Sequence, residues 1–188
     1  MAIAVRIKFL TVLGAALSLN LLSACTFTPV MGLTETTPPP TAIVAAPQLG
    51  VAGFGDFQFG QPVDTSRPDV VVMGEPVYAC AYARVNNESG PLMLMLIDGR
   101  LARIDIEGPE GRNQALANGL TIGSSVAEIK AVYGARAVAT PNKYDEHGTN
   151  YEISLSDTVG VVLETSEDKV TTFRIGRHEE VRWVEGCS

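Results

Sequence analysis

The sequence predicts an α+β fold of two tandem units, each a short helix followed by an antiparallel sheet. Three observations predict this fold class. Asp98-Gly99, the strongest short signal for a β-hairpin, lies between two apolar runs. Ser125 and Glu128 have the spacing of a capping box at a helix start. Similar glycine and turn signals recur roughly 60 residues apart, which is typical of a repeated unit.

Short apolar runs bounded by turn residues indicate the strands. The predicted strands are residues 78–84, 92–97, 101–106, 151–155, 160–164, 170–175 and 181–184. A helix is predicted over residues 126–133, where apolar side chains recur on one helical face. Gly134 follows this helix at the position of a left-handed C-cap.

The two halves of the chain, residues 51–118 and 119–188, show related patterns and are predicted to be the two units. The matched positions are Phe59-Gly60 with Ile122-Gly123, Gly74 with Gly134, and residues 98–104 with residues 167–173. The first copy departs from the pattern, because Pro62 and Pro68 interrupt its helical stretch. The alternative is that two antiparallel sheets in one chain resemble each other without duplication.

The chain is acidic. It has 14 Lys and Arg against 21 Asp and Glu, a net charge of −7. Residues 1–24 contain two basic residues and no acidic one, so their removal would make the charge −9. This balance argues against nucleic acid or an anionic membrane surface as the partner, because both favour basic patches.

Residues 1–24 have the pattern of an export signal, with Arg6 and Lys8 before an apolar run at residues 9–22. The run ends in Leu22-Ser23-Ala24-Cys25, which resembles the lipobox of bacterial lipoproteins. The resemblance implies cleavage before Cys25, a diacylglyceryl thioether on its sulfur, and further acylation such as palmitate on its amine. The alternative is an ordinary secretory signal in which the cysteine occurs by chance.

The lipobox resemblance also implies a location. Thr26 is not the aspartate that retains a lipoprotein at the inner membrane, so in a cell with two membranes the resemblance implies an outer-membrane lipid anchor facing the periplasm. Residues 25–50 are rich in Pro and Thr and predict an extended tether between anchor and folded part.

Cys80 and Cys187 remain once Cys25 is lipidated. Export to an oxidising compartment favours a disulfide between them, and Trp183 is expected to pack beside it. The alternatives are two free thiols, or a zinc site completed by His147 and His178, whose spacing fits no common zinc motif.

Two further resemblances concern the folded part. The stretches 119–133, 141–144, 170–176 and 180–187 are similar to those of uncharacterised proteobacterial lipoproteins. The unit of apolar-Gly, helix, Gly and antiparallel strands resembles the repeat of β-lactamase-inhibitor-protein folds. It also resembles small lipoproteins that help to assemble outer-membrane barrels. Those relatives present a sheet face to a protein partner, which implies binding rather than catalysis.

No catalytic residue, cofactor site or metal site is predicted. The acidic groups near Asp105 and Glu164 lie by strand ends and turns, where such residues are usually solvated. One possible interaction loop gathers polar and aromatic side chains, namely Lys143, Tyr144, His147 and Tyr151. The leading hypothesis is therefore a non-catalytic module that binds another envelope protein. The alternatives are an inhibitor of a periplasmic hydrolase and a small enzyme of unrecognised type.

Overall fold

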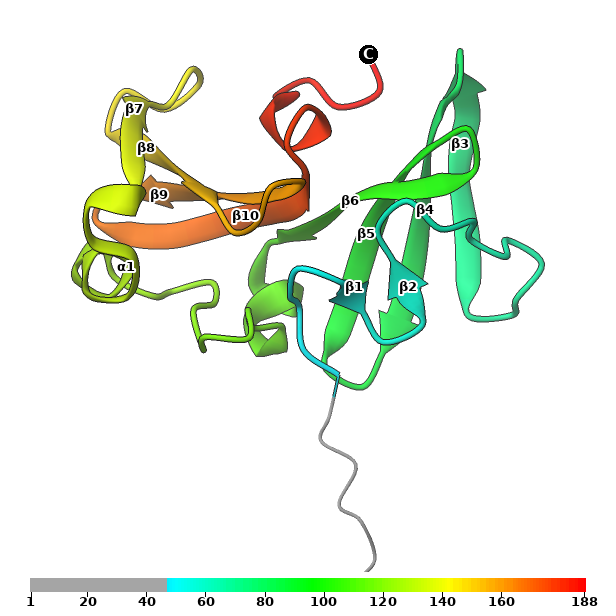
Figure 1. The fold of residues 1–188 in the computed structure, drawn as a ribbon, viewed down its shortest axis with the longest axis horizontal. Coiled ribbons are helices and arrows are strands. Elements are labelled where there is room, and N and C mark those ends of the chain that lie inside the picture. The colour runs from blue at the N-terminus through cyan, green and yellow to red at the C-terminus, as the bar shows by residue number, and fades with distance from the viewer. Residues whose placement is uncertain (1–46) are drawn as a thin grey trace, which may run out of the picture. The chain divides into compact units, whose positions relative to one another are not determined.

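The computed structural model describes residues 47–188, which belong to one compact unit (Figure 1). Eight strands form one antiparallel sheet in the order β3-β4-β5-β6-β10-β9-β8-β7. The strands are β3 (Val70–Val77), β4 (Cys80–Asn87), β5 (Gly90–Ile97), β6 (Arg100–Glu107), β7 (Val138–Pro141), β8 (Gly148–Ser154), β9 (Val159–Ser166) and β10 (Lys169–Arg177). Each half of the described chain thus supplies four consecutive strands, and the halves meet where β6 pairs with β10.

The remaining elements are short. They are β1 (Gly53–Phe54), β2 (Phe57–Gln58), α1 (Val126–Tyr133) and the 3-10 turns η1 (Pro109–Asn113), η2 (Gly134–Arg136) and η3 (Glu180–Arg182). Strands β1 and β2 form a separate two-stranded hairpin. None of the helices within residues 47–188 is long and apolar enough to cross a membrane.

The turns and the helix follow from local sequence. Asp98 and Gly99 both have positive φ in the turn between β5 and β6, as the Asp-Gly prediction requires. Helix α1 has the predicted bounds: the Ser125 hydroxyl accepts the N–H of Glu128 at 3.2 Å, and the Glu128 carboxylate accepts the N–H of Ser125 at 2.6 Å. Gly134 ends the helix with φ 56°.

One face of the sheet carries the main hydrophobic core. Alternate residues of the central strands point to this face, where they pack with Ile129 and Tyr133 of α1 and with Leu49 and Phe57. Leu49, which lies inside the predicted tether, is fully buried and forms a bridge with Leu116. The opposite face carries polar side chains on the same strands, among them Arg103, Asp105 and Arg174.

The predicted α+β class with two helix-plus-sheet units is wrong. The described chain is mainly β, and it contains one α-helix, in the second half. Where the first half was expected to have a helix ending at Gly74, Val70–Val77 forms strand β3 and Gly74 lies within it with φ 66°. Pro62 and Pro68 oppose a helix there, and the β-branched run Val70–Val72 favours a strand.

Candidate interaction site

The C-terminal segment, residues 178–188, crosses the polar face of the sheet, and we call it the strap. It contains η3 and otherwise irregular backbone, so the strand predicted over residues 181–184 is wrong. Figure 1 shows the strap leaving β10 and passing above β6, away from α1 and the β1–β2 hairpin.

Arg103, on β6, holds the strap down. Its Nη1 donates hydrogen bonds to the carbonyl oxygens of Glu180, at 2.8 Å, and Trp183, at 2.7 Å. Its Nη2 donates to the Tyr82 hydroxyl and to Asp105 Oδ2, both at 2.8 Å. The guanidinium is buried, so these partners replace the water that it loses.

A glycine makes room beside this arginine. Gly176 on β10 lies directly opposite Arg103 in the sheet. A Cβ at Gly176 would come within 2.4 Å of the Ala102 carbonyl oxygen and 2.7 Å of Arg103 Cα. On the same strand, Arg174 Nε donates to the Val181 carbonyl oxygen at 2.6 Å, which adds a second attachment for the strap.

Two carboxyl groups beside Arg103 have shifted pKa values. Burial raises the pKa of Asp105, although Arg103 Nε lies only 2.6 Å from its Oδ1 and opposes the shift. Partial desolvation raises the pKa of Glu107, and the neighbouring Asp105 adds to that rise. Both shifts therefore follow from burial of the acids on this sheet face, which outweighs the opposing charge of Arg103.

The predicted disulfide fastens the far end of the strap and is confirmed. Cys80, the first residue of β4, is bonded to Cys187, with 5.4 Å between their Cα atoms. The bond uses both thiols that the alternative zinc site would need. Gly186, with φ 68°, lies so close to Tyr82 that a Cβ there would be 2.4 Å from the tyrosine oxygen.

The predicted interaction loop is brought to the strap only in part. Lys143 Nζ lies 2.7 Å from a carboxylate oxygen of Glu185, and the Tyr144 hydroxyl contacts the same oxygen. His147 is exposed; its Nε2 lies 3.6 Å from a Glu146 carboxylate oxygen, and its backbone N–H donates to Asp145 Oδ1 at 2.9 Å. Tyr151 is buried in the core from β8. Lys143 and Tyr144 therefore steady the strap, while His147 and Tyr151 lie apart from it.

A polar cleft of about 450 Å³ opens on one side of the strap. Its lining includes Asp105, Glu107, Glu164 and Arg174. Arg103 engages Asp105, and Arg174 forms an ion pair with Glu164. Within residues 47–188, no three His, Cys, Asp or Glu side chains are grouped so that they could hold a metal ion. The polar groups of this cleft thus mainly bind one another and the strap.

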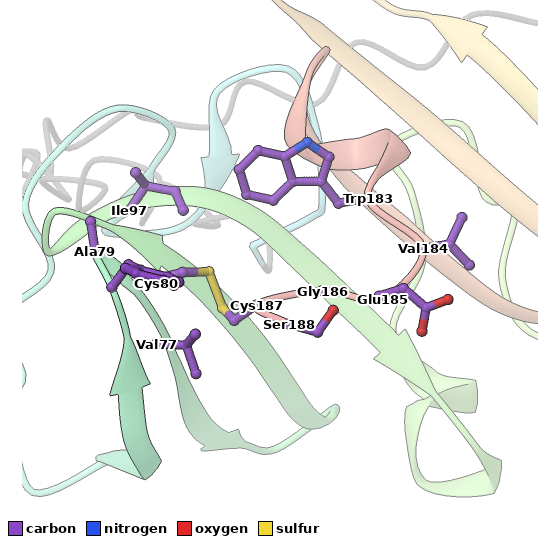
Figure 2. Close-up of a pocket in the computed structure, with 11 residues that line it drawn as sticks. Val77, Ala79, Cys80, Ile97, Trp183, Val184, Glu185, Gly186, Cys187 and Ser188 are labelled. Atoms are coloured by element: carbon purple, nitrogen blue, oxygen red, sulfur yellow. A yellow bond between two sulfur atoms is a disulfide. The ribbon is translucent and has the colours of Figure 1, made fainter.

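An apolar cleft of about 500 Å³ opens on the other side, between the strap and the β3–β4 turn. Figure 2 shows the Cys80–Cys187 bond in the middle of it, with Trp183 and Ile97 to one side and Val77 to the other. Trp183 is half-buried here, beside the disulfide as the sequence predicts. Side chains of this kind can receive an apolar group from another molecule.

Tyr78 lies on the rim of the apolar cleft at the tip of the β3–β4 hairpin. Its side chain is 101% exposed, and its φ of 54° is in the left-handed region that bulky residues avoid. Tyr78 therefore strains the backbone while it contributes no packing to the folded chain. Strain of this kind gathers at functional sites, where another requirement maintains it.

Comparison of the chain with protein-family models, with curated proteins and with solved structures finds no match in any of the three.

Exposed apolar side chains extend along β3 from Tyr78, at the rim of the apolar cleft. Ten large hydrophobic residues are exposed in the described chain, and six of them lie on β3, its turn or the strap. The six are Val71, Val72, Met73, Val77, Tyr78 and Val184. We call these six residues, together with the apolar cleft, the β3–strap surface. Sequence reasoning missed this surface, although the Val70–Met73 run after Pro68 carries the β-branched signal of a strand.

Proposed function

We propose that this chain is a non-catalytic protein-binding module and that it binds its partner through the β3–strap surface. The observation that carries the proposal is that six of the ten large hydrophobic residues exposed within residues 47–188 lie on β3, its turn or the strap, and three of them, Val77, Tyr78 and Val184, line one apolar cleft. Contiguous exposed apolar patches on soluble domains mark interaction sites, because leaving them in water is unfavourable.

Tyr78 supports the same proposal. Tyrosine is enriched at binding hot spots, since it combines a large apolar ring with a polar tip and little conformational freedom to lose. Here it stands fully exposed on the rim of the cleft, in a strained backbone conformation. A partner that covers Tyr78 and fills the cleft would bury the tyrosine ring and the apolar side chains that line the cleft.

The arrangement of the polar face favours binding over catalysis. Arg103 directs its two Nη atoms to the strap backbone, Tyr82 and Asp105, and Arg174 binds Val181 and Glu164. Groups engaged in this way maintain the surface rather than stand ready to exchange protons or electrons with a substrate.

We further propose that the module is lipid-anchored at Cys25, in the outer membrane, and faces the periplasm. Cys25 lies outside the described residues, so this proposal rests on the lipobox resemblance. Two or three acyl chains give lasting attachment, because each buried methylene contributes about 0.8 kcal/mol. A Cys25→Ala variant should lose labelling by a palmitate analogue and leave the membrane fraction. Unchanged partitioning would contradict the anchor.

Site-specific photo-cross-linking in intact cells tests the binding proposal. A photoreactive amino acid replaces Tyr78 in the full chain, and Val132 is the matched control, because it is an exposed apolar residue on α1 outside the surface. We expect one reproducible protein adduct from position 78 and none from position 132. Equal labelling from both positions, or no adduct from either, would refute the proposal.

A second candidate function is inhibition of a periplasmic hydrolase. One observation favours it: Tyr78 projects from the tip of a tight hairpin, as a side chain that enters an active site must. The identity of the cross-linked protein separates the two candidates. If that protein is a hydrolase, its activity should fall on adding the full chain but not on adding the Tyr78→Gly variant.

A further inference from the structure

Strand β3 lies at one edge of the sheet, and seven of its eight residues are exposed. Within the described chain no strand pairs with its outer side. The opposite edge strand, β7, ends at Pro141, which has no N–H to donate and so limits the use of β7 as a template. The regular part of β3 is Val70–Met73, because the register with β4 shifts between Met73 and Val77 and Gly74 has positive φ. A regular edge segment that exposes apolar side chains can accept a further strand.

The register shows which backbone groups of β3 face outward. The Val70 N–H donates to the Arg67 carbonyl oxygen, at 3.2 Å, rather than to β4. Backbone groups alternate in direction along an antiparallel strand, so the N–H and C=O of Val72 also point away from β4. The tight turn supports this assignment, because it pairs Val77 with Cys80. The backbone N–H and C=O groups of Cys80 therefore point toward β3, and by alternation so do those of Tyr82 and Arg84.

The side chains on this part of β3 are half-exposed on both faces of the sheet. Val71, Val72 and Met73 are exposed by 50%, 44% and 44%. A neighbouring strand would cover part of each one, so the complementary segment is apolar at the facing positions. Val77, at the end of β3, already lines the apolar cleft, so a segment that follows β3 reaches that cleft.

The charges disfavour a second copy of this chain as the added strand. Glu75 is the only charged residue of β3, and it forms no ion pair within residues 47–188. Asp69, just before β3, is already paired with Arg67 at 2.7 Å, so Glu75 is the charge of this edge that lacks a cation within residues 47–188. Two copies of a chain with a net charge of −7 repel each other, whereas a basic residue of a partner is attracted to Glu75.

We infer that an extended segment of a different polypeptide, apolar and with a basic residue facing Glu75, adds to β3 as a ninth strand of the sheet. This inference rests on the proposed function and specifies how the β3–strap surface is used. Backbone hydrogen bonds to Val72 supply attachment, while Glu75 and the cleft select the side chains of the segment.

Synthetic peptides and the full chain test the inference. The probe is an acetylated peptide of about nine residues, the length of a long strand, in which valine and threonine alternate around a central lysine. The matched peptide has glutamate in place of that lysine. We expect the lysine peptide to bind about two- to fivefold more tightly, as an exposed ion pair allows.

Two variants separate strand addition from side-chain docking. Val72→Pro removes the outward N–H and leaves the β3–β4 hydrogen bonds in place, whereas Val72→Thr keeps both the N–H and the β-branched shape. We expect the lysine peptide to bind Val72→Thr as it binds the original chain, and Val72→Pro about tenfold more weakly. Amide exchange at Val72 of the unaltered chain, followed by NMR, should slow when the peptide binds, which tests the inference even if Val72→Pro fails to fold.

Several outcomes would overturn the inference. They are absence of peptide binding, equal weakening by both Val72 variants, and unchanged exchange at Val72. Self-association of the chain that Val72→Pro abolishes would instead assign the edge to a second copy. If a partner still cross-links at position 78 in the Val72→Pro variant, the proposed function stands and strand addition alone fails.

Discussion

Tyr78→Gly should make the chain more stable while it removes binding. Residues with a Cβ in the left-handed region cost about 1–2 kcal/mol relative to their usual conformation, and Tyr78 has a φ of 54°. Its side chain is fully exposed, so removing it sacrifices no packing. Glycine adds freedom to the unfolded chain, which offsets roughly 0.5–1 kcal/mol of that gain. The net expectation is a free energy of unfolding higher by about 0.5–1 kcal/mol.

Urea denaturation of the full chain under non-reducing conditions measures this change, which corresponds to a melting temperature roughly 1–4 °C higher. Tyr78→Ala is the matched control, because it loses the ring but keeps a Cβ and therefore the strain. Both variants should lose the protein adduct formed through the β3–strap surface, while only the glycine variant gains stability. A Tyr78→Gly chain that is less stable by 1 kcal/mol or more would refute the reasoning, since it would mean that the ring packs in the folded state.

Three further predictions concern the strap and the polar cleft beside it. Arg103→Met should destabilise the chain by about 3–5 kcal/mol in urea unfolding, because it leaves Asp105 buried without its cation. A double variant that also carries Asp105→Leu should recover part of that loss, the rest being the hydrogen bonds from Arg103 to the strap; no recovery at all would contradict the pairing. Cys187→Ser should lower the free energy of unfolding by about 2–5 kcal/mol, and reduction of the unaltered chain should match it; no change on reduction would show that the bond contributes nothing. Glu107→Gln tests the pH dependence. A carboxyl whose pKa is raised on folding favours the folded state below its ordinary value of 4.5, and that contribution is lost as pH rises through the folded pKa. The stability of the Gln variant relative to the original chain should therefore rise with pH, and a constant difference in urea unfolding would contradict the shift.

Features that depend on neighbouring residues were predictable from the sequence. The capping box at Ser125 and the Asp98-Gly99 turn are set by local hydrogen bonds and backbone preferences, and both were predicted correctly. The pairing of Cys80 with Cys187 was also predicted correctly, because only two cysteines remained for an oxidising compartment.

The sequence-based predictions are wrong for segments whose conformation is set by contacts with residues distant in the sequence. The Val70–Met73 run was assigned to a helical stretch by analogy with the second half, although its β-branched residues favour the edge strand that forms. Residues 181–184 alternate as a strand does, yet Arg103 and Arg174 bind the carbonyl groups at this end of the chain and hold it as the strap. No local pattern identifies Arg103 as the anchor, because its partners lie about 80 residues away, at Glu180 and Trp183.

A cross-linking footprint in intact cells tests the central claim most directly. The photoreactive residue is placed in turn at Met73, Tyr78 and Val184 on the β3–strap surface, and at Val132 and Val138 elsewhere. The account predicts that the same protein is captured from the first three positions and from neither of the other two. Capture of that protein from position 132 or 138, with none from positions 73, 78 and 184, would contradict it.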